Sequence, residues 1–174
     1  MKKHFNVLVT RRLHNSALEE LGKKCNVTLH TGKIPIPKKI LMKKIREVDG
    51  LICHPYDTID KDVIQAAENL RAISTFSVGF DHIDIDFARS RGIKTGYTPE
   101  VLTNATAELT ITLILDVMRR VTEGDRLIRN KKWKQIFGAY DYTGIEISGK
   151  TIGILGMGRI GKQVSEKANG LGMK

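Results

Sequence analysis

The sequence predicts an α/β protein that forms one parallel-sheet domain and then begins a second. Three observations lead to this fold class. Short apolar strands alternate with helical segments over about the first 96 residues, which is the pattern of a parallel sheet with helices on both faces. A long apolar helical segment follows, and beyond it a second strand joins a helix through a glycine-rich turn. The 174 residues can hold one domain and part of another.

Five strands and four helices are expected in the first domain. The strands are predicted from short apolar runs at 5–10, 25–30, 48–53, 70–75 and 93–95. The helices between them are predicted at 16–22, 38–47, 61–69 and 84–91. Pro37 suits the start of the second helix, and Asp60 is a suitable N-cap for the third.

A single long helix is expected next, from Thr103 to about Asn130, with Thr103 as its cap. Its apolar residues surround much of the helix: Leu109, Ile111, Leu113, Ile114, Leu115, Val117 and Met118. Such a wide apolar surface predicts a helix buried between two bodies. Residues 131–147 are expected to be irregular.

A dinucleotide-binding turn is predicted at Gly156-Met157-Gly158-Arg159-Ile160-Gly161, between a strand at 151–155 and a helix at 159–173. In this motif the first glycine permits a tight turn, the second lets the backbone approach a pyrophosphate, and the third lets the helix pack on the strand. The helix N-terminus supplies N–H groups for the phosphates. The acidic residue expected about 20 residues later, for the ribose, would lie beyond Lys174.

Two other segments attract attention because of their positions. Ser77–Asp84 follows the fourth strand and contains Gly79, so its backbone N–H groups can face an anion. From spacing alone, an ordinary strand-to-helix turn is the preferred interpretation, with Asp81 and His82 as a structural pair. Residues 98–108 by themselves are a capped helix start.

Composition favours a cytoplasmic protein without a nucleic-acid or membrane partner. The net charge is +10, from 29 basic and 19 acidic residues, but the lysines are scattered in pairs with few aromatic residues between them, as on a solvated surface. No stretch approaches the roughly 18 apolar residues of a membrane span, and the N-terminal apolar run is too short for a signal peptide. Cys25 and Cys53 give no disulfide framework and no metal-binding spacing, and Cys53 is expected to be a buried, inert thiol.

The motifs taken together resemble the D-isomer-specific 2-hydroxyacid dehydrogenases, and within them the glyoxylate/hydroxypyruvate reductase branch most. The resemblance runs from Phe5 to Lys174 and corresponds to the N-terminal half of a family member. It rests on the order of five segments, namely Val78-Gly79-Phe80-Asp81-His82-Ile83-Asp84, Arg91-Gly92-Ile93, Thr98-Pro99-Glu100-Val101-Leu102-Thr103, Thr106-Ala107-Glu108 and the glycine turn, and on Arg119-Arg120.

This resemblance implies a two-domain, NAD- or NADP-dependent enzyme that reduces a small 2-oxo acid such as glyoxylate or hydroxypyruvate. Residues 1–100 would be the flavodoxin-like substrate domain, and 101–174 the incomplete start of the Rossmann cofactor domain. The full-length protein would be a homodimer, with the active site in the cleft between the domains and Trp133 near the subunit contact. The residues that distinguish NAD from NADP follow the second Rossmann strand, so the choice stays open.

The resemblance also implies the site residues. Val78 and Gly79 would bind the substrate carboxylate through their N–H groups, and Thr106 would contact the cofactor near the nicotinamide. The remaining cofactor-binding residues would be Gly156, Met157, Gly158, Arg159, Ile160 and Gly161, of which 158–160 bind the pyrophosphate. The family's catalytic histidine, its carboxylate partner and its arginine follow the glycine motif, so no catalytic residue is assigned here, and none of the five histidines matches. We expect this chain alone to be inactive.

Three questions stay open. His54 and Tyr56 stand where relatives carry Leu and Ser in the substrate pocket, and they either change that pocket or simply cap the end of a loop. A phosphoglycerate dehydrogenase-like enzyme is an alternative function, although its pocket would need more cationic groups. A non-catalytic, NAD-sensing regulator on the same fold is another.

Overall fold

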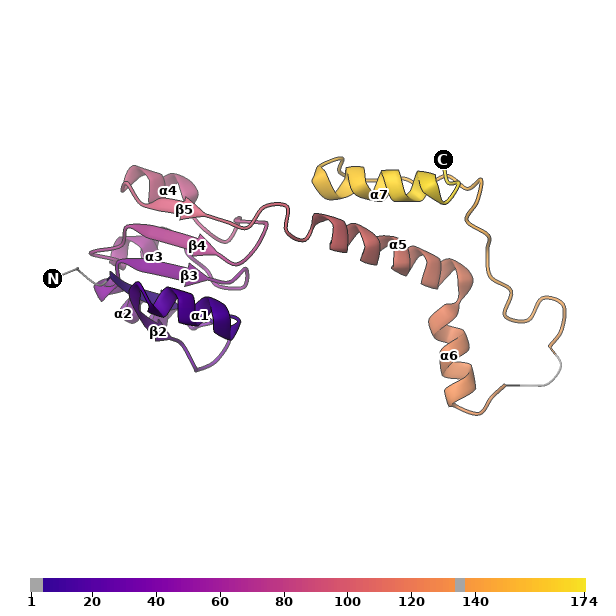
Figure 1. The fold of residues 1–174 in the computed structure, drawn as a ribbon, viewed down its shortest axis with the longest axis horizontal. Coiled ribbons are helices and arrows are strands. Elements are labelled where there is room, and N and C mark those ends of the chain that lie inside the picture. The colour runs from indigo at the N-terminus through magenta and orange to yellow at the C-terminus, as the bar shows by residue number, and fades with distance from the viewer. Residues whose placement is uncertain (1–4, 134–136) are drawn as a thin grey trace. The chain divides into compact units, whose positions relative to one another are not determined.

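A computed structural model describes residues 5–133 and 137–174, and the chain divides into two compact units, Met1–Pro99 and Glu100–Lys174 (Figure 1). We call them unit 1 and unit 2 and describe each by itself. No helix in the described ranges is long and apolar enough to cross a membrane.

Unit 1 contains one five-stranded, fully parallel sheet, as the α/β prediction requires. Its strands are β1 (Phe5–Val9), β2 (Cys25–Leu29), β3 (Gly50–Cys53), β4 (Ala72–Thr75) and β5 (Lys94–Gly96). Their order is β2-β1-β3-β4-β5, with Leu8 paired to Leu51 and Leu51 to Ile73 across the middle of the sheet. The chain therefore changes direction across the sheet at β1, which lies between β2 and β3.

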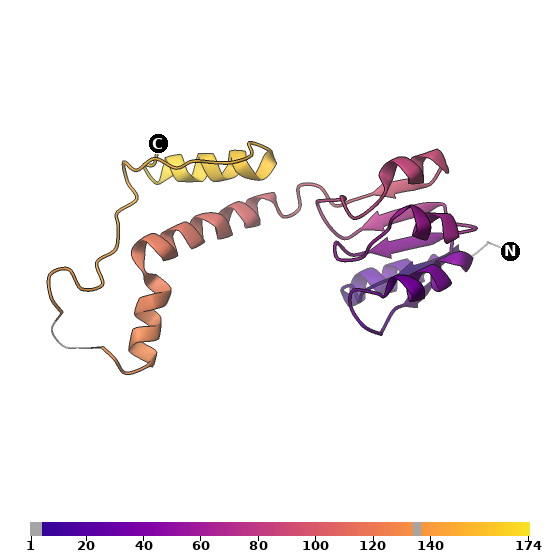
Figure 2. The ribbon, with the colours of Figure 1, turned by 180° about the vertical axis from the view of Figure 1, so that it is seen from behind.

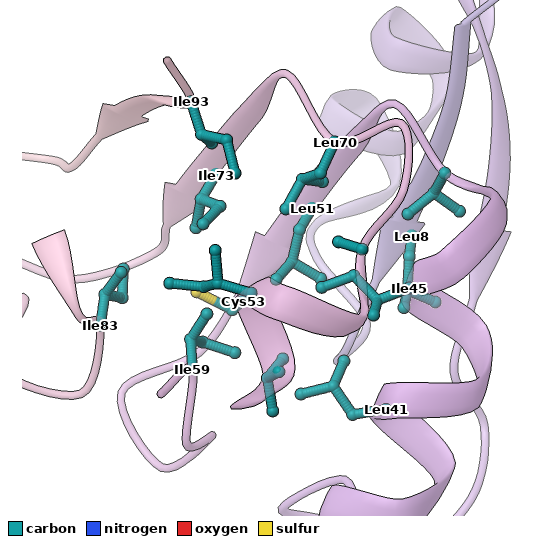
Figure 3. Packing of buried hydrophobic residues seen from close by; sticks show 14 of the residues in the cluster. Leu8, Leu41, Ile45, Leu51, Cys53, Ile59, Leu70, Ile73, Ile83 and Ile93 are labelled. Carbon is teal, nitrogen blue, oxygen red and sulfur yellow. The ribbon is translucent and has the colours of Figure 1, made fainter. Parts of the chain in front are cut away.

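Helices cover both faces of this sheet. α1 (Asn15–Gly22) lies on one face, while α2 (Lys38–Lys44), the 3-10 turn η1 (Ile45–Glu47), α3 (Lys61–Ala66) and α4 (Ile85–Ser90) lie on the other (Figures 1 and 2). The core is on the second face, where Leu8, Leu51 and Ile73 from the strands pack with Leu41 and Ile45, each at most 1% exposed (Figure 3). Alternate residues of each strand face this core, because side chains alternate across a strand.

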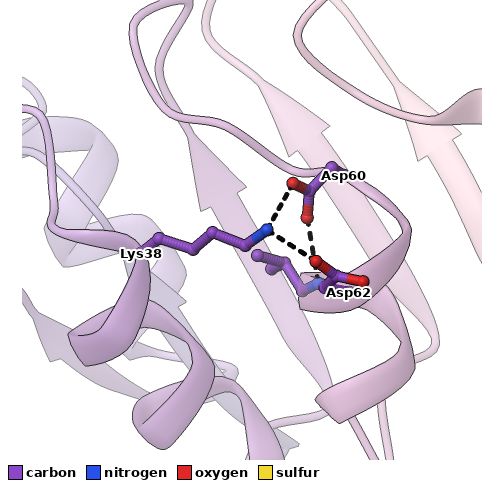
Figure 4. Close-up of polar contacts among 4 residues, drawn as sticks. Lys38, Asp60 and Asp62 are labelled. Carbon is purple, nitrogen blue, oxygen red and sulfur yellow. Dashed lines mark hydrogen bonds and ion pairs between the residues drawn. The ribbon is translucent and has the colours of Figure 1, made fainter.

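Aspartate side chains cap two of these helices, Asp84 at α4, where it accepts from the N–H of Phe87 at 2.9 Å, and Asp60 at α3. Asp60 accepts a hydrogen bond from the backbone N–H of Val63 at 3.2 Å, so the predicted N-cap of α3 is confirmed. Asp60 and Asp62 also bind the Lys38 ammonium at 2.6 and 2.8 Å, which ties the start of α2 to the start of α3 (Figure 4). The hydrogen bond from Lys38 lowers the pKa of Asp60.

Unit 2 contains α5 (Thr103–Arg119), α6 (Val121–Arg129) and α7 (Arg159–Gly170), so the prediction of one continuous helix over 103–130 is wrong. The break is at Arg120, whose backbone is left-handed with φ 56°. Asp116 explains the break, because its carboxylate accepts hydrogen bonds from both the N–H and the hydroxyl of Thr122, at 2.6 and 2.7 Å, and so caps the first turn of α6. Thr103 is likewise the first helical residue of α5 and not its cap, which is Leu102 without a capping side chain.

The core of unit 2 lies between α5 and α7, which run side by side in both views (Figures 1 and 2). Ala107 and Ile111 on α5 pack with Val164 and Ala168 on α7. The opposite side of α5 exposes Leu109, Leu113 and Val117, the last at 75%. Within unit 2, α5 is therefore buried on one side only, and the expectation of burial between two bodies is not met there.

The expected strand over 151–155 is also absent from the described part of unit 2. Strand pairing there is limited to Lys174, whose N–H donates to Lys150 and whose carbonyl accepts from Ile152, both at 2.8 Å. These two bonds follow the pattern of a parallel bridge, but a single partner residue cannot form a ladder. Leu155, which belongs to the expected strand, is fully exposed.

This difference in pairing predicts uneven protection of the backbone. β4 is hydrogen-bonded to strands on both sides, whereas 151–155 has no partner strand in the described chain. In native-state hydrogen exchange of this 174-residue chain, we expect slow exchange at 72–75 and fast exchange at 151–155. Equally strong protection of both segments in a monomer would contradict this expectation, and equal protection in a dimer would show that a partner chain covers 151–155.

Candidate functional site

In unit 1 the polar residues gather where strands β1, β3 and β4 end. After β4, the Ser77 hydroxyl donates to the carbonyl of Gly79 at 2.6 Å. Thr98 donates to the Ser77 carbonyl through both its N–H and its hydroxyl, at 2.9 and 3.0 Å. These hydrogen bonds fix the turn at 77–79 through the carbonyl groups of Ser77 and Gly79.

The N–H groups of this turn are differently placed. Within the described residues, neither Val78 nor Gly79 donates its N–H to a protein acceptor. A Cβ at Gly79 would meet only the Asp81 carboxylate, at 3.6 Å, so this position has room for an alanine side chain. Two adjacent N–H groups beyond the carboxyl end of a parallel strand can bind a carboxylate.

His82 has a structural role beside this turn, although its partner differs from the expected one. Its Nε2 lies 2.9 Å from the Thr75 hydroxyl and 3.8 Å from Cys53 Sγ, whereas the sequence suggested Asp81. Burial lowers the pKa of His82, against the opposing effect of Asp57 and Asp81. Burial also raises the pKa of Cys53 to about 12, so its thiol stays protonated, as expected for an inert cysteine.

The buried carboxylate of Asp57 connects the ends of β1 and β3. It is 3% exposed and accepts hydrogen bonds from the Thr10 hydroxyl, from the N–H of His54 at 2.8 Å and from the N–H of Ile36 at 3.3 Å. The His54 ring then lies against a pocket of about 220 Å³, and its centroid is 5.2 Å from that of Tyr56, which is 70% exposed. Nothing in the sequence pattern singled out Asp57.

In unit 2 the glycine turn 156–161 has the geometry that its sequence suggests. Gly156 has φ 95°, in the region that favours glycine. A Cβ on Gly161 would lie 2.0 Å from the Gly156 carbonyl oxygen, so only glycine lets α7 approach the turn this closely. Around Gly158, by contrast, a Cβ would meet nothing within 4 Å, and this residue is the N-cap of α7.

The start of α7 offers several N–H groups to a ligand. The first amide after Gly158 that bonds back is Lys162, which donates to the Gly158 carbonyl at 3.0 Å. The N–H groups at 158–161 precede it and have no partner inside the helix. Arg159 forms an ion pair with Glu100 at 3.3 Å, and the Met157 side chain is exposed.

Beside this turn, a pocket of about 360 Å³ is lined by Gly156, Ile160 and Gly161 together with Thr110 and Ile114 of α5. Thr106 lies one turn earlier on α5, and its carbonyl accepts a hydrogen bond from the Thr110 hydroxyl at 2.8 Å. Thr110 lines this pocket but was not among the site residues predicted from the sequence. Its spacing of four residues from Thr106 could have indicated it, because such residues share a helix face.

Alanine substitutions should separate the roles of two of the glycines. We expect Gly161→Ala to destabilise unit 2 by about 1–3 kcal/mol, because its Cβ must displace a backbone carbonyl, and this outweighs a gain in helix propensity of about 1 kcal/mol. Gly158→Ala should cost less, at most about 1 kcal/mol from the weaker N-cap, since the space around its Cβ is open. Urea unfolding followed by helical circular dichroism measures both, and a Gly161→Ala chain as stable as the parent would refute the assignment.

The lowered pKa of His82 predicts how stability depends on pH. Since this histidine binds a proton less readily in the folded chain, the unfolded chain takes up more protons as pH falls below about 6.5. The stabilisation is therefore complete above that pH and is lost as pH decreases towards 5. We expect His82→Asn to flatten part of this decrease in urea midpoints between pH 7 and 5, whereas parallel profiles for variant and parent would contradict the assignment.

Comparison with known proteins gives a consistent result. The family model for the catalytic domain of D-isomer specific 2-hydroxyacid dehydrogenases matches residues 7–169. Proteins named glyoxylate reductase from Thermofilum pendens and Pyrococcus horikoshii are 45% and 39% identical to this chain, in each case over 97% of it and over 50% and 51% of their own lengths. The chain thus spans about half the length of the curated relatives it matches.

Solved structures agree on the fold. The TT0316 protein from Thermus thermophilus is 42% identical with a TM-score of 0.89, over 97% of this chain and 54% of its own. A glyoxylate reductase from Paecilomyes thermophila is 27% identical with a TM-score of 0.78, over 98% of this chain and 54% of its own. The family and the half-length extent that the motifs predicted are confirmed: the chain belongs to the D-isomer-specific 2-hydroxyacid dehydrogenases.

Proposed function

We propose that the complete protein carrying this sequence is an NAD- or NADP-dependent oxidoreductase that reduces glyoxylate or hydroxypyruvate to the 2-hydroxy acid. The observation that carries the proposal is the glycine turn of unit 2, where Gly161 is required by packing and Gly158 leaves open space at a helix N-terminus. That combination suits a pyrophosphate. The glyoxylate reductase relatives support the substrate.

In this proposal, the cofactor supplies the hydride when it is bound. The N–H groups of Gly158, Arg159 and Ile160 hold its pyrophosphate, while Gly156 and Gly161 shape the turn and Met157 lies within it. Thr106 contacts the cofactor on the nicotinamide side of the pocket that Thr110 lines. We assign no proton-donating role to any of these side chains.

The substrate carboxylate is held in unit 1 by the N–H groups of Val78 and Gly79. Two hydrogen bonds fix the orientation of the acid at this turn. Thr98 contributes indirectly, because its N–H and hydroxyl both hold the Ser77 carbonyl, which shares a peptide plane with the N–H of Val78. We assign no proton donor within this chain.

The proposal has consequences for organisation. We propose that residues 1–100 form the substrate domain and that 101–174 begin the cofactor domain of a cytoplasmic homodimer. The exposed apolar residues on α5, Leu109, Leu113 and Val117, support a subunit contact. The scattered distribution of the lysines speaks against a nucleic-acid partner.

Substituting Gly79 in the complete protein tests the carboxylate turn. Gly79→Pro removes the N–H donor, and we expect kcat/KM for glyoxylate to fall about 10- to 100-fold, which is the usual effect of losing a hydrogen bond to a charged group. Gly79→Ala keeps the donor and fits the available space, so it should retain most of the activity. The assay follows NADH and NADPH oxidation.

Unfolding midpoints of both variants control for misfolding. If a folded Gly79→Pro protein reduced glyoxylate as efficiently as the parent, the carboxylate would bind elsewhere. If the parent protein turned over neither glyoxylate nor hydroxypyruvate with either cofactor, the proposed function itself would be wrong.

A further inference from the structure

We propose that the pocket at the ends of β1 and β3 is an oxyanion-binding site in which Arg11 binds a carboxylate or phosphate group. The proposal extends the proposed function, on which it partly rests, from acids with one anionic group to ligands that carry a second. It concerns a site separate from the N–H groups of Val78 and Gly79.

The position of the pocket follows from the strand order. Because β1 lies between β2 and β3, the connections that leave β1 and β3 run to opposite faces of the sheet, and they leave a crevice at the carboxyl ends of the two strands. The pocket of about 220 Å³ lies in this crevice and is lined by residues 10–13 after β1, 52–54 at the end of β3 and Phe76 after β4. Ligands of open α/β sheets bind at such points.

Two arginines, Arg11 and Arg12, give the pocket a positive charge, and His54 beside them is neutral. Arg11 Nη1 lies 3.3 Å from His54 Nε2. A guanidinium only donates hydrogen bonds, so this imidazole nitrogen accepts, and His54 is uncharged in this arrangement. Burial and the nearby Arg11 both lower the pKa of His54, in agreement with a neutral ring.

Acidic side chains do not neutralise these arginines in the described ranges, where neither Arg11 nor Arg12 takes part in an ion pair. Arg12 donates to the neutral amide of Asn15 at 2.9 Å. The carboxylate at this edge, Asp57, is buried and already accepts from three donors, so it faces the interior.

The size of the pocket admits such a ligand. A volume of about 220 Å³ holds one carboxylate or phosphate group together with its nearest waters. The guanidinium presents parallel N–H groups that match two oxygens of such an anion. Phe76, whose N–H donates to the Cys53 carbonyl at 3.0 Å, forms a wall one residue before the turn at 77–79.

An NMR titration of the 174-residue chain tests the site, with inorganic phosphate, malonate and acetate as probes at constant ionic strength. We expect phosphate and malonate to shift the Arg11 Nε–H signal and the backbone amide signals of Arg12 and His54 saturably. The two amide signals remain in every variant and therefore report the affinities. Arg11→Gln should weaken this binding about tenfold or more, as for a lost charge-assisted hydrogen bond. The matched control is Arg89→Gln, which removes the same charge from an exposed position on α4 and should leave the affinity within about twofold.

The probes also distinguish the source of the anion. Binding of phosphate at least as tight as that of malonate supports a site for a separate anion. Tighter binding of malonate, with simultaneous shifts at Arg11 and the Gly79 amide, supports a second anionic group on one ligand. Absence of a saturable shift at Arg11, or equal affinities for Arg11→Gln and parent, overturns the proposal.

The Gly79 amide separates this proposal from the proposed function. If acetate shifts Gly79 while no probe shifts Arg11, the oxyanion site is refuted and the carboxylate turn stands. If the probes shift Arg11 but never Gly79, the oxyanion site stands and the carboxylate turn is refuted.

Discussion

The buried carboxylate of Asp57 holds together the edge of the sheet on which the chemistry of unit 1 depends. Its hydrogen bonds reach Thr10 after β1, His54 after β3 and Ile36 before α2, so three segments far apart in the sequence end at one point. A buried carboxylate is stable only when its oxygens are well satisfied. The same bonds place Arg11 and the His54 ring at the pocket, because Arg11 follows Thr10 and His54 itself donates to Asp57.

The glycine turn of unit 2 shows that one motif can serve packing and binding through different residues. Only glycine fits at position 161, because a Cβ there would lie 2.0 Å from the Gly156 carbonyl oxygen. A Cβ at Gly158 would meet no protein atom within 4 Å. A glycine with open space beside it at a helix N-terminus lets a ligand come close to the backbone N–H groups. Gly158 therefore carries the functional argument, and Gly161 the structural one.

Much of the fold could be predicted because its signals are local. The five strands, the four helices of unit 1 and the cap at Asp60 follow from apolar runs and from residues that compete for backbone hydrogen bonds. The helix break at Arg120 could not be predicted. It depends on the carboxylate of Asp116, which accepts hydrogen bonds from Thr122, six residues further along the chain. The strand expected at 151–155 needs neighbours for its hydrogen bonds, and a local pattern cannot supply them.

The sequence by itself determined the family and the α/β class, since motif order and glycine spacing are properties of the chain alone, and it predicted the residues of both turns. Only the tertiary structure decided that His82 bonds to Thr75, that Thr110 lines the pocket of the glycine turn, and that Arg11 meets a neutral His54. The Arg11–His54 contact depends on the strand order, which places the ends of β1 and β3 side by side. The pocket at Thr110 depends on the packing of α5 on α7. No single segment encodes either arrangement.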